Sequence, residues 1–230
     1  MIVIRGAARL SLEPSDTLLE RVPQGMPELR APLLRADRLC GLALVTVARL
    51  LAENPSLRSD VSGDDVAVVL GTAHGCHKTD EEYYLSFLQG QPSPRLFAYT
   101  LPSSPGGELS IFYRLRGPGL ALCSGRASGL LAIGEAENLL STGQAAACLV
   151  LAIEVAGASL SSVPRSDAAA ALWLTRHPPA CDGDLPRISA TAESFFAGDP
   201  NRAVARSLAA MPSATVFADR ETACLAGQSL

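Results

Sequence analysis

The sequence predicts an α/β fold, because apolar patterns typical of helices alternate along the chain with short, continuously apolar runs typical of buried strands. The clearest strand is 66–70, Val-Ala-Val-Val-Leu, as expected for a central parallel strand buried on both faces. The clearest helix is 36–53, whose apolar residues recur every three or four positions until Asn54-Pro55 ends the pattern. With 230 residues and 48% hydrophobic composition, the chain can bury a sizeable core around such elements.

The remaining elements follow from the same two patterns. Strands are expected at 1–5, 109–113, 119–123, 145–153, 168–175 and 187–196, and helices at 79–88, 126–141 and 202–211. Thr79 is expected as an N-cap, because three acidic residues follow it in the first turn. The Pro-, Gly- and Ser-rich segment 91–107 is expected to be a long loop with a functional or interface role. The helix at 126–141 has so few polar positions that we expect it to be buried between layers.

Composition argues against several classes of function. A formal net charge of -4 offers no basic face for nucleic acid or anionic lipid. No apolar run reaches the ~18 residues that suggest a membrane span, and no secretory signal pattern is present, so we expect a cytoplasmic protein. The six cysteines lack paired spacing and are expected to be reduced. His74-Gly75-Cys76-His77 lacks a second ligand pair, so we expect a loop there, with no metal and no cofactor.

The most informative motif is the segment from Gly117 to Ser128, Gly-Pro-Gly-Leu-Ala-Leu-Cys-Ser-Gly-Arg-Ala-Ser, which runs directly into the apolar helix pattern. Further motifs stand around it in a fixed order: Gly71-Thr72, Phe97-x-x-Thr100-Leu101-Pro102, Gly106-Gly107, Leu115-Arg116-Gly117-Pro118 and a strand ending at Glu154. In their order and spacing, residues 66–175 resemble the N-terminal half of a β-ketoacyl synthase of the thiolase superfamily.

This resemblance implies a thiolase-like layered α/β fold in its N-terminal half, a mixed five-stranded sheet with a buried helix, and an incomplete second half. It divides the chain into a synthase-like N-terminal domain, 1–177, and a short divergent C-terminal extension, 178–230. Dimers of the superfamily join their sheets edge to edge through the strand after the nucleophile helix, which is 145–153 here. A half-length protein also leaves apolar surface that needs a partner.

The resemblance also implies that the usual nucleophile is missing. The family turn, close to Gly-Pro-x5-(Thr/Ser)-(Ala/Gly)-Cys-x-Ser, delivers a reactive cysteine to a helix N-terminus, and the same frame places Arg126 at that position. The two family histidines, in motifs like His-Gly-Thr-Gly-Thr and Asn-x-x-Gly-Phe-Gly-Gly, have no counterpart in this sequence. Arginine cannot form a thioester, and its cation faces the positive end of the helix dipole. We therefore predict no catalytic residue, and we expect Arg126 to pair with a carboxylate, keep its head in water or bind an anionic acyl or phosphate group.

Cys123 lies three residues before Arg126, on the strand side of the turn. Because it lacks the helix-start position that lowers the pKa of a thiol, we expect it to be a small core residue rather than a nucleophile. Loss of acyl transfer in a Cys123→Ala variant would overturn this interpretation.

A synthase-like chain without its nucleophile resembles a chain-length factor, which pairs with an active β-ketoacyl synthase and limits product length. The short length of the present chain, together with Arg126, makes it most similar to the truncated synthase-like proteins of type II systems that make aryl polyenes or related polyene chains. The implied partners are an active synthase, in a heterodimer, and the acyl carrier protein that carries the growing chain. The positions implied to line the tunnel or interface, if they are not ordinary packing residues, are Tyr83, Tyr84, Phe87, Phe97, Tyr99, Thr100 and Arg126.

Two other functions stay open at this point. One is a decarboxylase or acyltransferase that uses residues the sequence does not identify. The other is a scaffold that docks acyl carrier protein without shaping the product, through basic residues such as Arg114 and Arg116. Acidic carrier proteins disfavour an acidic partner, so the second alternative requires a local basic patch.

Overall fold

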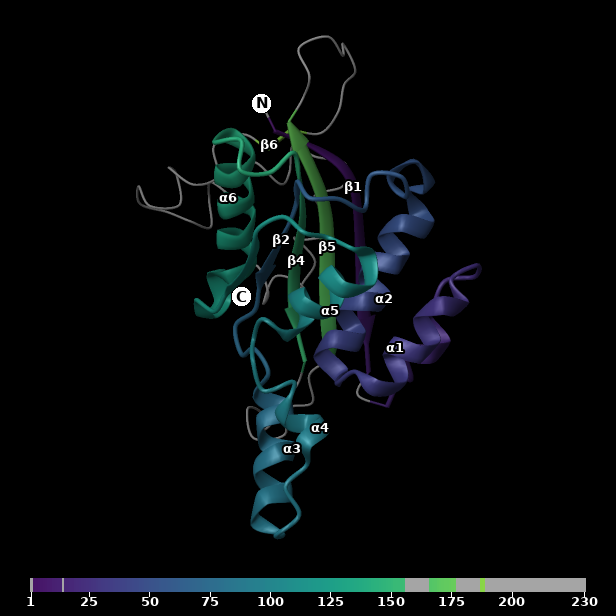
Figure 1. The fold of residues 1–230 in the computed structure, drawn as a ribbon, viewed down its shortest axis with the longest axis vertical. Coiled ribbons are helices and arrows are strands. Elements are labelled where there is room, and N and C mark those ends of the chain that lie inside the picture. The colour runs from purple at the N-terminus through teal and green to yellow at the C-terminus, as the bar shows by residue number, and fades with distance from the viewer. Residues whose placement is uncertain (1, 14, 156–165, 177–186, 189–230) are drawn as a thin grey trace.

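The computed structural model describes residues 2–13, 15–155, 166–176 and 187–188, which form one sheet with helices on both faces (Figure 1). The sheet has six strands in the order β3-β2-β4-β5-β1-β6. The strands are β1 Ile2–Leu12, β2 Val66–Gly71, β3 Gly119–Leu122, β4 Ala147–Glu154, β5 Asp167–Arg176 and β6 Arg187–Ile188. The helices are α1 Arg30–Arg35, α2 Arg38–Glu53, α3 His77–Leu88, α4 Pro94–Phe97, α5 Ser104–Tyr113 and α6 Ser128–Ser141.

The sheet is mixed, as predicted. Strand β2 runs parallel to β3 and β4, whereas β5 runs antiparallel to β4 and β1. These five strands confirm the expected five-stranded sheet, and β6 adds two residues beside β1. Strand β1 is longer than the predicted 1–5: it pairs with β5 as far as Leu12, with an irregularity in the pairing between Ile4 and Gly6.

Each face of the sheet carries its own core. Helices α2 and α5 cover one face, where the side chain of Trp173 on β5 is fully buried. Helix α6 covers the other face through Ala132, Leu139 and Leu140, while Leu130 on its first turn is only partly buried. Helix α2 confirms the prediction at 36–53. It begins after Asp37, whose side chain caps it by accepting a hydrogen bond from the Cys40 N–H at 2.9 Å.

Two sequence predictions in the middle of the chain are wrong. The segment 91–107 is not a loop, because it contains α4 and the start of α5. The predicted strand 109–113 is the C-terminal half of α5. Prolines explain the error: Pro94 and Pro105 lie in the first turns of these helices, where the missing N–H of proline costs nothing.

The predicted N-cap of α3 is also wrong. Helix α3 begins at His77, and the N-cap position is Cys76, whose side chain makes no capping hydrogen bond. Thr79 is buried inside the first turn, and its hydroxyl donates to Asp37 Oδ2 at 2.6 Å. The Thr79 hydroxyl therefore bonds to a residue 42 positions away in the sequence and does not cap α3.

The expectation that strand 145–153 forms the dimer edge is wrong. That strand is β4, which lies inside the sheet between β2 and β5. Among the described residues, the outermost strand on the β2 side of the sheet is β3, which pairs with β2 alone. Strand β5, predicted at 168–175 as a strand or edge element, is also internal.

Several predictions fall on residues outside the described ranges. Only Arg187–Ile188 of the predicted strand 187–196 is described, and the predicted helix 202–211 lies outside, as does most of the extension 178–230. Within the described part of the chain, we find no helix that is both long enough and apolar enough to cross a membrane.

Candidate functional site

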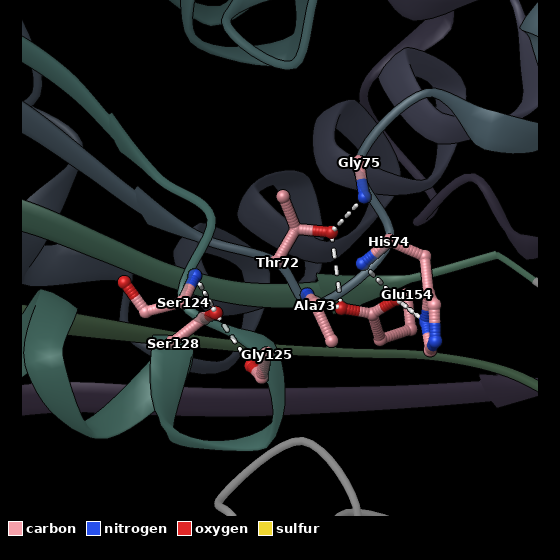
Figure 2. Close-up of polar contacts among 8 residues, drawn as sticks. All are labelled: Thr72, Ala73, His74, Gly75, Ser124, Gly125, Ser128 and Glu154. Carbon is pink, nitrogen blue, oxygen red and sulfur yellow. Dashed lines mark hydrogen bonds and ion pairs between the residues drawn. The ribbon is translucent and has the colours of Figure 1, made fainter.

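Polar side chains gather where the three parallel strands end. Thr72 follows β2, Ser124 closely follows β3, and Glu154 ends β4 (Figure 2). Because parallel strands bring their carboxyl ends to one edge of a sheet, these residues lie at the edge where α/β proteins commonly bind ligands.

Glu154 is the centre of this group. Its Oε1 accepts hydrogen bonds from the Thr72 hydroxyl at 3.0 Å and from the Ala73 N–H. Its Oε2 accepts from the His74 N–H at 3.3 Å and pairs with His74 Nδ1 at 2.9 Å (Figure 2). The Thr72 hydroxyl in turn accepts from the Gly75 N–H at 2.9 Å. One carboxylate thus holds the segment that connects β2 to α3.

The turn before α6 is closed by one serine. Ser128 Oγ accepts from the Ser124 N–H at 2.8 Å and donates to the Gly125 carbonyl at 2.6 Å (Figure 2). Gly71 at the end of β2 touches this turn so closely that a Cβ there would overlap the Ser128 carbonyl. The first residues of α6 therefore pack directly against the end of β2.

Arg126 lies in a single 3-10 turn, Gly125–Ala127, immediately before α6. The α-helix therefore begins two residues later than the predicted 126–141, with Ala127 at its N-cap, and Arg126 stands just before it. Its side chain lies outside what the structure describes, so its pairing with an anion stays a prediction.

The prediction that Cys123 is a core residue is wrong, because its side chain is exposed. The reason is topological: β3 is the outermost of the described strands at its end of the sheet, and Cys123 follows it where the chain leaves the sheet. Partial desolvation, and to a lesser degree the negative charge of Glu154, raise the pKa of the Cys123 thiol. A nucleophilic cysteine needs a lowered pKa, so this environment does not activate it.

The predicted tunnel residues lie on or near α3 and α4. The rings of Tyr83 and Phe97 meet with centroids 5.5 Å apart and join the two helices. Tyr84 and Phe87 are 60% and 59% exposed, and Phe97 is similarly exposed. Sequence reasoning missed three further exposed apolar side chains here, although their hydrophobicity was visible: Leu85, Leu88 and Leu101.

The other two predicted residues, Tyr99 and Thr100, lie in the segment between α4 and α5. The Tyr99 hydroxyl donates to Glu108 Oε1 at 3.0 Å, and burial together with this carboxylate raises the pKa of Tyr99 to about 12. The Thr100 hydroxyl donates to the Phe97 carbonyl at 2.8 Å. These two residues therefore make structural hydrogen bonds within the protein.

The His74-Gly75-Cys76-His77 segment sends its polar side chains to different carboxylates. His74 pairs with Glu154, the Cys76 thiol donates to Asp80 at 3.4 Å, and His77 Nε2 lies 3.3 Å from Glu81. Within the described ranges, no three histidine, cysteine or acidic side chains gather closely enough to hold a metal ion.

Comparison with known families and structures decides the relationship. Residues 22–180 match the family "Beta-ketoacyl synthase, N-terminal domain". The chain belongs to the β-ketoacyl synthase family. The sequence resemblance at 66–175 is thus confirmed over a longer stretch, and the α/β architecture agrees with that family. Among curated proteins, none matches the chain in sequence.

Solved structures similar to this β-ketoacyl synthase family member share its fold at low sequence identity. The ishigamide ketosynthase/chain length factor has a TM-score of 0.62 at 19% identity, over 98% of this chain and 81% of that chain. A ketosynthase in complex with its chain length factor from Xenorhabdus doucetiae has a TM-score of 0.57 at 18% identity, over 77% of this chain and 80% of that chain. A type II PKS acyl-carrier protein in complex with its ketosynthase has a TM-score of 0.59 at 17% identity, over 76% of this chain and 62% of that one.

Proposed function

We propose that this chain is a non-catalytic, chain-length-factor-like subunit that pairs with an active β-ketoacyl synthase and shapes the acyl tunnel. The setting is a cytoplasmic pathway of polyketide, aryl polyene or fatty-acid-type biosynthesis, in which an acyl carrier protein brings the growing chain to the complex. The observation that carries the proposal is Arg126, which stands before α6 where the family has its cysteine. A permanently charged guanidinium cannot form the acyl thioester.

The free side of β3 supports a heterodimer. In the described part of the chain β3 pairs on one side only, so its outer backbone groups are available to a second sheet. Leu101, Ile111 and Leu120 are exposed large apolar residues in or near β3 and α5. Large apolar side chains that stay exposed in the chain alone are candidates for burial against a partner.

The exposed aromatic residues support a role in limiting product length. Tyr84 and Phe87 are bulky and well exposed on α3, which extends past the end of the sheet (Figure 1). In a complex with the synthase, such side chains would close the acyl tunnel by excluded volume.

Co-expression with a β-ketoacyl synthase and an acyl carrier protein that are encoded by adjacent genes tests this proposal. We expect the chain to co-elute with the synthase, and we expect Tyr84→Ala and Phe87→Ala to shift products to longer chains by mass spectrometry. Leu34→Ala is the matched control, because Leu34 is an exposed apolar residue on α1, outside α3 and α4. A stable monomer that does not bind the synthase, or unchanged product length in complexes of both α3 variants, would contradict the proposal.

One observation favours a second function, acyl transfer through Cys123. Its thiol is exposed at the edge where the parallel strands end, although its raised pKa opposes nucleophilic attack. An acylation assay separates the two functions. Acyl transfer by the purified chain that Cys123→Ala abolishes would make this chain an acyltransferase.

A further inference from the structure

We propose that Glu154 and Asp37 are positioning residues that fix the direction in which α3 and α4 leave the body of the protein. We call α3, α4 and the residues between them, 77–97, the α3–α4 arm. The consequence for product length rests on the proposed function, since the arm carries Tyr84 and Phe87. The direction of the arm itself does not depend on that function.

The arm has almost no hydrophobic core to hold it in place. Thr79 is the one buried residue of α3, and α4 has none. The ring contact between Tyr83 and Phe97 joins the two helices to each other rather than to the sheet. Figure 1 shows both helices extending past the end of the sheet. Because apolar packing does not orient the arm, its direction must depend on the polar contacts at its base.

Asp37 makes the first of these contacts. Its side chain is 7% exposed and has two partners on different elements. Oδ1 accepts from the Cys40 N–H of α2 at 2.9 Å, and Oδ2 accepts from the Thr79 hydroxyl of α3 at 2.6 Å. A buried hydrogen bond of this kind is costly to leave unmade, so it ties the first turn of the arm to the N-terminus of α2.

Glu154 makes the second contact. It ends β4, a strand fixed by neighbours on both sides, and it accepts backbone hydrogen bonds from Ala73 and His74 just before the arm begins. The next residue, Gly75, has a φ of +60°, in the left-handed region that favours glycine, and its N–H donates to the Thr72 hydroxyl at 2.9 Å. Because the Thr72 hydroxyl itself donates to Glu154, this one carboxylate anchors the connecting segment both directly and through Thr72.

Two further contacts lie on the returning side: Arg95 Nη1 of α4 donates to the Arg35 carbonyl of α1 at 3.4 Å, and the Tyr99 hydroxyl donates to Glu108 Oε1 at 3.0 Å. For this reason the loss of one carboxylate contact should widen the range of arm directions without releasing the arm. The arm should keep its helices, because their mutual contact through Tyr83 and Phe97 is untouched.

Distance measurements between two spin labels test the inference on the isolated full chain. The labels go on Gln89→Cys, at the tip of the arm, and Ser56→Cys, on the body, both exposed positions. Every labelled variant also carries Cys123→Ser, Cys181→Ser and Cys224→Ser, so that the spin label does not react at these three positions. We expect Glu154→Ala and Thr79→Val to widen the distance distribution at least twofold. Glu154→Gln should restore most of the parent width, because its amide oxygen can still accept from Thr72 and Ala73.

The control and the second variant keep the test decisive. Glu82→Ala removes an arm carboxylate that pairs with Lys78 on the same helix, so it should leave the distribution unchanged. Thr79→Val preserves the Asp37 cap of α2, and it decides the outcome if Glu154→Ala does not fold. Parent-like widths in the folded variants, with circular dichroism unchanged, would overturn the inference.

Product length separates this inference from the proposed function. In the complex with the synthase, Thr79→Val should broaden the distribution of product lengths. If the variants widen the distance distribution of the arm but Tyr84→Ala and Phe87→Ala both leave product length unchanged, the proposed function fails and the positioning role stands. If Tyr84→Ala lengthens products but the arm distances never change, the positioning role fails alone.

Discussion

Arg114 is the one non-glycine residue with a positive φ in the described ranges, at 56°. It stands at the C-cap of α5 in the left-handed region, with its N–H donating to the Ser110 carbonyl. Glycine reaches this region without the steric cost that a Cβ brings. The left-handed conformation costs a residue with a Cβ about 1–2 kcal/mol, and the greater freedom of glycine in the unfolded chain offsets about 0.4–1 kcal/mol of this. We therefore expect Arg114→Gly to raise the free energy of unfolding by about 0.5–1 kcal/mol in urea titrations. Arg116→Gly is the control, because Arg116 has no positive φ and pairs with Asp64, so it should not stabilise.

The chemistry of Cys123 gives a second prediction at the same scale. Since partial burial and the Glu154 carboxylate raise the pKa of its thiol, less thiolate forms at neutral pH. We expect iodoacetamide to alkylate Cys123 at pH 7 more slowly than a cysteine in a short peptide. Glu154→Gln should lower the pKa toward the ordinary value and speed the reaction at pH 8. Mass spectrometry of the Cys123 peptide measures both rates, and a rate above the peptide reference would contradict the prediction.

At the scale of elements, two glycines give opposite expectations. A methyl group on Gly71 would overlap the backbone of Ser128, so β2 and α6 would have to separate. A methyl group on Gly107, inside α5, would meet no atom within 4 Å. We expect Gly71→Ala to lower the free energy of unfolding by about 1–3 kcal/mol, and Gly107→Ala to raise it by up to about 1 kcal/mol through helix propensity. Equal effects of the two substitutions in urea titrations would refute this contact between β2 and α6.

The accuracy of the sequence predictions varies with the kind of signal each element carries. Helix α2 and strand β2 were predictable, because an amphipathic period or a continuous apolar run identifies them without any partner. Helix α5 was not, because its proline and two glycines suggested a loop and its packing against α2 is a tertiary effect. The turn at Arg126 was predictable by resemblance. The Glu154 contacts were not, because 80 residues of chain separate this carboxylate from His74.

At the scale of the whole molecule, strand order decides where a partner can bind. The sequence predicts that β4 is a strand, but it carries no information on which strands are its neighbours. The structure places β4 inside the sheet and β3 beside solvent in the described part of the chain. The Pro118 carbonyl accepts from the Val68 N–H of β2, and the Leu122 carbonyl accepts from the N–H of Thr72, just after β2. Because strand residues alternate in direction, the N–H of Ala121 points to the free side.

This N–H gives a test of how two subunits join. Ala121→Pro removes it while leaving the hydrogen bonds to β2 in place, because proline lacks a backbone N–H and is tolerated on edge strands. If the synthase sheet pairs with β3, we expect the Kd of the complex to rise at least tenfold by calorimetry. Ala121→Ser keeps the N–H and should bind like the parent chain. Unchanged affinity in a folded Ala121→Pro variant would mean that the partner binds elsewhere, and the apolar surface of the α3–α4 arm would then be the surface to map.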